Sequence, residues 1–400
     1  MRPIIRWKTI ATVAALLPGL GLFSIACRQS PPAAPAAAEP ASVRVYVGTY
    51  TSGDSKGIYR LRLDLTTGAL SPEGEPTETV SPSFLALHPD GRVLYAVNET
   101  GDGPEAQSGG VTAFAIDPAS GALRLLDQQP SGGPAPCHLS LDREARHLLV
   151  ANYWGGSVSV FPLDPEGRLG AATQLVQHTG GTSAPGRDPG PHAHFVDLDA
   201  ANRFALVADL GRDEVLVYRF EPGAGRLEAN DPPALSLGEG SGPRHLAFHP
   251  DGHHLFVINE LASTVSVLSF DPEAGVLQEL QTVTSLPEGY SGKNSTAEVE
   301  VSADGRFLYG SNRGHDSIAV LSIDPDDGSL KSLEWAPSGG KMPRNFVIDS
   351  TGQWLLAANQ ASNTINFLQI DPESGRLTPT DRSLEVVSPV CLRFLPLSRN

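Results

Sequence analysis

Short apolar segments alternate with polar, turn-forming residues along almost the whole chain. One recurring unit is an apolar segment, a turn and a second apolar segment that ends in a polar residue, as in SFLALHPDGRVLYAVN and RHLAFHPDGHHLFVIN. The closing polar residue follows the first residue at the same spacing in every copy, from Ser83 and Asn98 to Arg344 and Asn359. A constant spacing through differing residues predicts a β-hairpin whose turn is Pro-Asp-Gly or its equivalent.

A second motif, DPxxGxL or a close variant, marks another turn. Its copies begin at Asp64, Asp117, Asp164, Glu221, Asp271, Asp324 and Asp371. Hairpin and motif together make a unit of four strands that recurs roughly every 50 residues, which is typical of the blades of a β-propeller.

The two ends of the chain complement each other. The segment VRVYVGTY aligns with the second strand of the hairpin and has no first strand before it, whereas the segment from Ser388 to Pro396 repeats the pattern of Ser81 to Pro89. We therefore predict an all-β fold, a seven-bladed β-propeller of four-stranded blades from about Val43 to Asn400. The C-terminal strand joins the N-terminal blade and closes the ring, which leaves no free sheet edge.

Composition narrows the class of protein further. The chain has 41 Gly and 34 Pro in 400 residues, too many for long helices. With 29 basic against 45 acidic residues its formal net charge is −16, which argues against a nucleic-acid partner, because phosphate contacts need clustered Lys and Arg. Three Cys are too few for a disulfide framework.

The N-terminus reads as a targeting segment. Basic residues precede a largely apolar stretch that ends in Ser24-Ile25-Ala26-Cys27, so we predict a signal peptide over residues 1–27. Cys27 after a small residue resembles a bacterial lipoprotein cleavage box, and residues 28–42 form a Pro/Ala-rich tether. We expect an exported protein, periplasmic or membrane-anchored only through a lipid on Cys27. An ordinary signal with an incidental Cys and an uncleaved anchor remain alternatives, and the sequence does not indicate the oligomeric state.

The hairpin geometry places the variable residues together. The start of its first strand and the end of its second strand lie at the same end, so these positions should ring one mouth of the central channel. Apolar packing positions repeat from blade to blade, whereas the mouth residues differ, as a binding site requires. The polar residues at or next to these positions are Glu99, His192, His194, Arg244, His245, Glu260, Asn312, Arg313 and Arg344.

These residue types suggest a reaction. Guanidinium groups pair with carboxylate or phosphate, so the expected ligand is a small anionic or carbonyl-bearing molecule. His194 with Glu260 could activate a water, and an Arg could stabilise an oxyanion. We therefore predict His194, Glu260, Arg244 and Arg313 as catalytic residues of ester or lactone hydrolysis without a metal. Arg344, His192, His245, Glu99 and Asn312 are predicted to bind substrate.

The residues at the channel mouth allow other interpretations. Arg and Glu at a channel mouth often pair only with each other and with water. Cys137 has no paired base beyond His138 and reads as a small buried residue rather than a catalytic thiol. His192 and His194 form an H-x-H pair that could ligate zinc, but a third ligand is not evident, so no metal site is predicted.

Several segments carry a family resemblance. YVGTYTSGDSKGIY, GPRHLAFHPDG, VINELASTV, SNRGHDSIAVL and PHAHF resemble the propeller-type lactonase family, from about Val43 to the end of the chain. That family includes the bacterial seven-bladed 6-phosphogluconolactonases and is similar in fold to the carboxy-muconate lactonising enzymes. The resemblance implies active residues at His194, Arg244, Glu260 and Arg313, and no metal cofactor.

We therefore expect a lactone hydrolase that opens a sugar lactone to its hydroxy acid. Whether His194 or Glu260 is the general base stays open, as does the presence of a phosphate on the substrate, because a phosphorylated lactone should be scarce outside the cytoplasm. Two other readings remain. One is an exported non-catalytic propeller that serves as a binding scaffold; the other is a muconate-type lactonising enzyme, since two Arg would suit two carboxylates equally well.

Overall fold

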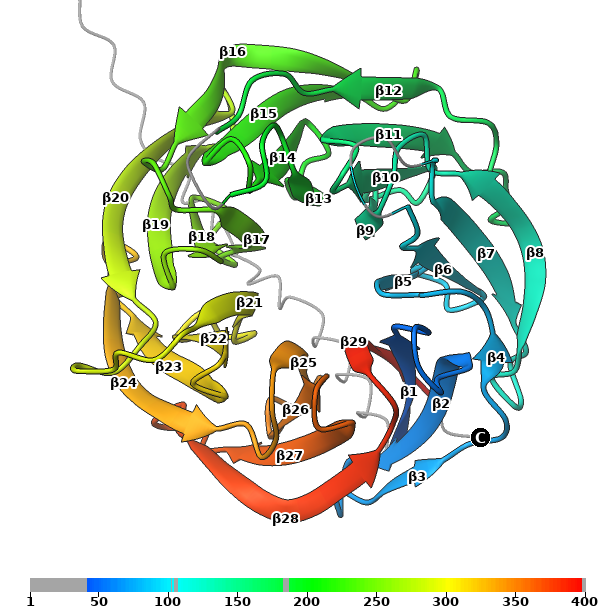
Figure 1. Cartoon of the computed structure of the whole chain (residues 1–400), viewed down its shortest axis with the longest axis vertical. Helices are drawn as coiled ribbons and strands as arrows, with labels where there is room; N and C mark the ends of the chain where they lie inside the picture. The colour runs from blue at the N-terminus through cyan, green and yellow to red at the C-terminus, as the bar shows by residue number, and fades with distance from the viewer. Residues whose placement is uncertain (1–41, 102, 104–106, 183–186, 398–400) are drawn as a thin grey trace, which may run out of the picture. The chain divides into compact units, whose positions relative to one another are not determined.

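The computed structural model describes residues 42–101, 103, 107–182 and 187–397, which form seven antiparallel sheets around a central channel (Figure 1). These residues contain strands and turns but no helix, and accordingly no helix that could cross a bilayer. The all-β, seven-bladed propeller predicted from the repeats is thus confirmed. The predicted signal peptide, Cys27 and all but the last residue of the tether lie outside the described residues.

Six of the sheets have four strands in sequence order, running from the channel outwards, and the seventh combines the two ends of the chain. The first three of the six are β5 (Leu85–Leu87), β6 (Val93–Asn98), β7 (Gly110–Ile116), β8 (Leu123–Pro130); β9 (Pro136–Leu141), β10 (His147–Asn152), β11 (Ser157–Pro162), β12 (Gln174–Gln177); and β13 (Ala193–Leu198), β14 (Phe204–Asp209), β15 (Glu214–Glu221), β16 (Arg226–Ser236). The other three are β17 (Pro243–Phe248), β18 (His254–Asn259), β19 (Thr264–Asp271), β20 (Val276–Thr284); β21 (Ser295–Val301), β22 (Phe307–Arg313), β23 (Ser317–Ile323), β24 (Leu330–Pro337); and β25 (Pro343–Ile348), β26 (Trp354–Asn359), β27 (Thr364–Ile370), β28 (Leu377–Glu385).

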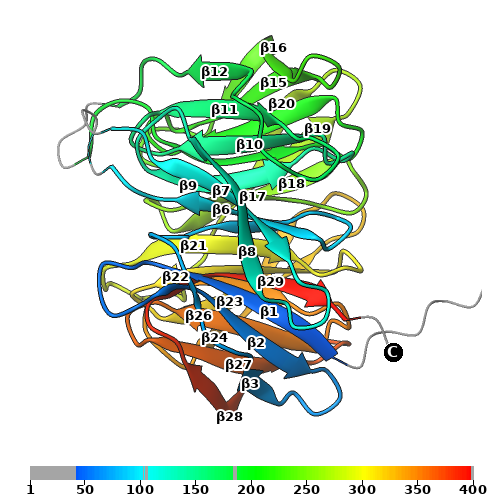
Figure 2. The ribbon, with the colours of Figure 1, turned by 90° about the vertical axis from the view of Figure 1, so that its right-hand side faces the viewer.

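The closing blade joins both ends of the chain, as predicted. It consists of β29 (Pro389–Pro396), β1 (Ser42–Thr49), β2 (Gly57–Asp64) and β3 (Leu70–Pro72), with the two-residue β4 (Thr77–Glu78) also paired to β2. The register pairs Val43 with Pro396 and Val47 with Leu392. Both views place β29 beside β1 (Figures 1 and 2).

The DPxxG motif forms the turn between the third and fourth strands of the blades. Its glycine has a positive φ, from 59° to 78°, in all seven copies, a conformation that costs glycine little. The motif's acidic residue caps the turn; in one copy Asp271 Oδ1 accepts hydrogen bonds from the backbone N–H groups of Glu273 and Ala274. The motif therefore fixes the chain reversal that builds each blade.

The hydrophobic core lies between neighbouring blades, and polar contacts connect them at its edge. Tyr46, Tyr95 and Tyr309 are buried side chains on the second strands of three blades. The hydroxyl of each donates a hydrogen bond of 2.9 Å to the carbonyl of the DPxxG glycine in the next blade: Gly121, Gly167 and Gly375 respectively. Each of these contacts satisfies a buried hydroxyl and fixes one blade against the next.

β-Bulges at the channel mouth decide which side chains face the channel. In β13, β17 and β25 the register with the second strand shifts around His194, Arg244 and Arg344, so each of these residues is the extra one in its strand. A bulge breaks the strict alternation of a strand and re-aims a side chain. As a result two successive residues, such as Arg244 and His245, both line the channel.

Candidate active site

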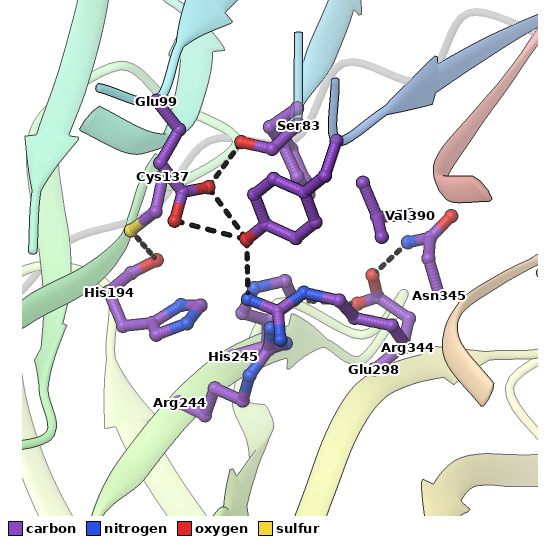
Figure 3. Close-up of a pocket in the computed structure, with 12 residues that line it drawn as sticks. Ser83, Glu99, Cys137, His194, Arg244, His245, Glu298, Arg344, Asn345 and Val390 are labelled. Carbon is purple, nitrogen blue, oxygen red and sulfur yellow. Dashed lines mark hydrogen bonds and ion pairs between the residues drawn. The ribbon is translucent and has the colours of Figure 1, made fainter. Parts of the chain in front are cut away.

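The mouth of the channel holds a narrow cavity formed by the innermost strands and the loops beside them (Figure 3). Its lining residues are Tyr50, Ser83, Phe84, Glu99, Cys137, His194, Arg244, His245, Glu298, Arg344, Asn345 and Val390. The cavity volume is about 10 Å³, roughly the space of one water molecule. A ligand of sugar size therefore has to lie over these residues, while a single water fits among them.

Glu260 holds two of the predicted arginines. Its Oε2 atom lies 2.9 Å from Arg244 Nε and 2.9 Å from Arg313 Nη2. Each guanidinium also donates to a backbone carbonyl, Arg244 to Ala297 at 2.7 Å and Arg313 to Thr296 at 2.8 Å. Both arginines are buried, so their positions are fixed on two sides.

The charges of this group perturb one another. Burial lowers the pKa of Arg313 to about 10 and also lowers the pKa of Arg244, which has Arg344 near it as well. Burial by itself would raise the pKa of Glu260, but Arg313 and Arg244 outweigh it and hold that pKa below its usual value. Glu260 therefore stays ionised and is a weak proton acceptor.

Arg344 belongs to a separate hydrogen-bonded chain (Figure 3). Its Nη2 donates to the Tyr50 hydroxyl at 2.9 Å, and that hydroxyl donates in turn to the Glu99 carboxylate, 2.9 and 3.0 Å from its two oxygens. The Ser83 hydroxyl donates to the same carboxylate. Burial raises the pKa of Tyr50; for Arg344 burial opposes the charge, but Tyr50 and Glu99 prevail and raise the pKa.

His194, one of the two candidate bases, is buried and lines the cavity. Burial, followed by the positive charge of Arg244, lowers the pKa of His194 well below 6.5. Its Nδ1 atom is buried and has no hydrogen-bond partner among the described residues. His194 is therefore neutral at pH 7 and keeps a ring nitrogen available for a ligand or a water.

A second ring of side chains lies one residue further along the innermost strands. Here His245 Nδ1 lies 2.8 Å from Glu298 Oε1, and Asn345 Nδ2 donates to the other oxygen of that carboxylate. Because an ionised carboxylate only accepts, the proton of neutral His245 sits on Nδ1 and the lone pair on Nε2, which is buried without a partner in the described part of the chain. Burial lowers the pKa of His245 to about 4.

Four predicted site residues lie outside the cavity lining. Two of them, Glu260 and Arg313, are ion-paired to each other, and Glu260 also pairs with the lining residue Arg244. The other two are the predicted binding residues Asn312 and His192.

Asn312 is fully buried within its blade; its Nδ2 donates to the Ser285 carbonyl at 2.8 Å, and its Oδ1 accepts from the Ser285 hydroxyl at 2.8 Å. His192 stacks on Tyr153 with ring centroids 4.6 Å apart and borders a neighbouring hollow with Trp154. The bonds made by Asn312 anchor one blade. His192 supports the Tyr153 side chain, whose ring lies next to that of His194.

The alternatives for Cys137 and the H-x-H pair can also be placed. Cys137 is buried, its Sγ lies 3.5 Å from the His194 carbonyl oxygen, and burial raises the pKa of its thiol well above the usual value, which disfavours a thiolate. Neither His192 nor His194 belongs to a group of three His, Cys, Asp or Glu side chains close enough to share a metal ion, within the described residues.

The sequence did not point to Glu298, Asn345 or Phe84 as cavity residues. Each follows directly after a predicted mouth position, Ala297, Arg344 or Ser83, and the alternation of a regular strand would turn it away from the channel. The bulges remove that alternation. The available signal was a polar residue at this position in four blades, namely two His, a Glu and an Asn, where the other three carry Phe or Cys.

The fold and this constellation agree with the comparison to known families. The model of the seven-bladed β-propeller lactonases matches residues 44–394. The chain therefore belongs to the lactonase family of seven-bladed β-propellers.

Individual relatives span nearly the whole propeller. A 6-phosphogluconolactonase of Bacillus subtilis is 36% identical over 350 residues, 88% of this chain and 97% of that protein. A 6-phosphogluconolactonase of Formosa agariphila is 33% identical over 76% of this chain and 86% of its own length. Among solved structures, a periplasmic gluconolactonase of Pseudomonas aeruginosa superposes with a TM-score of 0.84 at 36% identity, covering 89% of this chain and all of that one.

Proposed function

We propose that this protein hydrolyses a sugar lactone to its open-chain hydroxy acid at the mouth of the channel. The observation that carries the proposal is the convergence there of a neutral His194 with three arginines, two of them held by Glu260. Membership of the lactonase family and the similarity to a gluconolactonase and to 6-phosphogluconolactonases support the reaction class.

His194 is the better candidate for the general base. Glu260 is shared by two guanidinium groups and its pKa is lowered, so it accepts a proton poorly. The unpartnered Nδ1 of His194 can take a proton from a water as the water oxygen attacks the lactone carbonyl. The same proton then passes to the ring oxygen as the C–O bond of the tetrahedral intermediate breaks, which yields the free hydroxyl and a carboxylic acid that releases the second water proton to solvent.

The arginines stabilise the negative charge that develops on the carbonyl oxygen. Arg244 and Arg313 are already oriented by Glu260 and by backbone carbonyls, so little reorganisation is needed in the transition state. Arg344, held by Tyr50, supports the substrate from the next blade along the mouth. The carboxylates Glu260 and Glu99 at the mouth are already engaged by arginines and by Tyr50, which leaves neither free to coordinate a cation, and we therefore propose that the hydrolysis needs no metal.

The substrate we favour is an unphosphorylated lactone of the gluconolactone type. Glu260 faces Arg244 and Arg313, and Glu99 faces Arg344 through Tyr50, so most of the positive charge at the mouth is already compensated. A phosphate dianion would need more uncompensated charge than this. The predicted export of the chain points to the same choice, as does the similarity to a periplasmic gluconolactonase.

Side-by-side hydrolysis of glucono-δ-lactone and 6-phosphogluconolactone in a pH-stat tests the proposal. We expect hydrolysis of the unphosphorylated lactone above the spontaneous rate, and its loss in His194→Asn and Arg244→Ala. Arg306→Ala is the matched control, because Arg306 pairs with Asp304 on an exposed turn. Turnover of the phosphorylated lactone alone would overturn the substrate assignment, and no turnover of either lactone would favour the binding scaffold.

A further inference from the structure

A second cluster of chemically competent side chains lies at the other end of the β17–β18 hairpin. His249, Asp251 and His254 surround the His-Pro-Asp-Gly turn between these strands, and one ligand atom of each lies within 4.8 Å of the others. Arg244 and Glu260 stand at the opposite end of the same hairpin. A six-residue strand spans about 20 Å, so the cluster is remote from the proposed active site.

Both imidazoles approach one carboxylate oxygen through the same type of nitrogen. Asp251 Oδ2 lies 2.9 Å from His249 Nδ1 and 2.7 Å from His254 Nδ1. All three side chains are partly accessible to solvent, so an ion can reach them. Two imidazole nitrogens and a carboxylate are a common ligand set for zinc and similar cations.

The hydrogen bonding of His249 points to a cation at this position. Its Nε2 lies 2.9 Å from the carbonyl oxygen of Gly305 in the next blade, and a carbonyl only accepts, so Nε2 carries the ring proton. Nδ1 of a neutral ring then directs its lone pair toward the carboxylate oxygen of Asp251. The backbone N–H of Asp251, 3.3 Å from the same Nδ1, offsets that repulsion in part, and a proton or a metal ion between the two groups would remove it. A carbonyl that holds the far N–H is also the usual support of a metal-bound histidine.

The equivalent turn of another blade provides an internal comparison. It has the same His-Pro-Asp-Gly sequence, and His88 Nδ1 lies 2.8 Å from Asp90 Oδ1. There, however, Arg92 follows the turn, and its guanidinium pairs with Asp90 through Nε at 2.6 Å. In the β17–β18 turn the residues after Gly252 are His253 and His254, and no arginine pairs with Asp251 among the described residues.

We propose that His249, Asp251 and His254 bind a divalent transition-metal cation of the zinc type. The three ligand atoms lie within 4.8 Å of one another, and tetrahedral ligands about 2.0 to 2.1 Å from zinc lie roughly 3.3 Å apart, so the carboxylate has to withdraw by about half an ångström and the two imidazole nitrogens have to adjust around the ion. Water completes the coordination. Because His249 also contacts Gly305 of the next blade, the bound ion stabilises the contact between these two blades rather than the reaction at the mouth.

Equilibrium dialysis against zinc chloride at pH 7.5, with the full mature chain purified without a polyhistidine tag, tests the site. The variants are His254→Arg, which replaces a proposed ligand with a side chain that can pair with Asp251, and Asp251→Asn, with His88→Gln as the matched control. We expect one bound zinc per chain in the wild type and the control, and affinity weakened at least about tenfold in both site variants. Zinc should also raise the thermal unfolding midpoint of the wild type and of the control, because their site is intact, and should leave that of the two site variants unchanged.

Circular dichroism without zinc establishes whether each variant is folded. If His254→Arg does not fold, the test rests on Asp251→Asn. Two outcomes would overturn the proposal: no saturable zinc uptake by the wild type, or uptake that both site variants retain. In either case a proton, not a metal, occupies the position between His249 and Asp251. Because the readouts are binding and unfolding, they do not depend on the proposed hydrolysis.

Discussion

The two ends of the propeller use the same charged residue types in different ways. At the turn end, Arg306 and Asp304 form an isolated pair about half exposed to water. At the channel mouth, Arg244, Arg313 and Glu260 share one ion-paired group in which both arginines are buried. Exposed pairs contribute little beyond solubility, whereas buried ones shift pKa values and hold side chains in fixed positions. Burial of the arginine and carboxylate side chains therefore makes the channel mouth, and not the turn end, suitable for catalysis.

Replacing Arg244 should have the largest effect. The Arg244→Ala change removes a guanidinium that is fixed on two sides, and we expect kcat/KM for lactone hydrolysis to fall by about 10² to 10³. Arg306→Ala should leave it unchanged. The measurement is initial-rate hydrolysis in a pH-stat with spontaneous opening subtracted. Equal rates in both variants would remove the distinction between the two ends.

The second test concerns the contribution of His245, in the second ring of side chains, to the free energy of unfolding. Because the pKa of His245 is about 4 in the folded protein and 6.5 ordinarily, the unfolded chain takes up the proton first as the pH falls. Stability is complete above pH 6.5 and is lost toward pH 4, by about 3 kcal/mol. The other groups that face or influence this ring are Arg244, Glu298, Arg393, His138, His194 and Asn345.

Urea unfolding at pH 7 and pH 4.5 measures this contribution. His245→Asn keeps a donor for Glu298 but does not titrate, so its stability should fall by about 2 kcal/mol less than that of the wild type over this range. The exposed residue His253 offers the control, since no comparable burial acts on it. Parallel losses in wild type and His245→Asn would mean that the second ring stores no such energy.

The third test asks whether His194 is the base. His194→Asn should lower the rate by about 10². In the wild type, the lowered pKa keeps His194 deprotonated down to pH values well below 6.5, so the rate declines only there. That acidic limb should vanish in His194→Asn. If the limb persists in this variant and is lost in Glu260→Gln, the base is Glu260.

The smallest effect belongs to the contacts between blades. Tyr95→Phe removes a buried hydroxyl that bonds Gly167 across two blades, and we expect the free energy of unfolding to fall by about 1 kcal/mol. The rate of lactone hydrolysis should not change, because Tyr95 does not line the mouth. Denaturant unfolding provides the measurement, with Tyr59→Phe on the outer part of the first blade as a control.

The fold could be predicted well from the sequence because the turn motif and the hairpin pattern repeat regularly along the chain. Seven DPxxG turns and a hairpin of constant spacing each follow from local chemistry, and the alignment of Ser388 with Ser81 predicted the closing strand. The mouth was harder to predict. Cavity-lining Glu298 and Asn345 were missed because bulges replace the alternation of strands, and Asn312 was assigned to the site although its amide binds Ser285, in the segment that links β20 to β21. Pairing across the ring, such as that of Arg344 with Tyr50, has no signature in local sequence.

The pairing of β29 with β1 also sets the order of events during biosynthesis. The first strand to leave the ribosome shares a sheet with the last one, so the earliest blade stays incomplete until the end of translation. Joining the two strands closes the longest loop the chain contains, which makes it a late and slow step. Until then the growing chain is an open arc with an unpaired edge. The ring therefore depends on β29, and deleting Pro389–Pro396 would leave the other blades intact in sequence but the ring open.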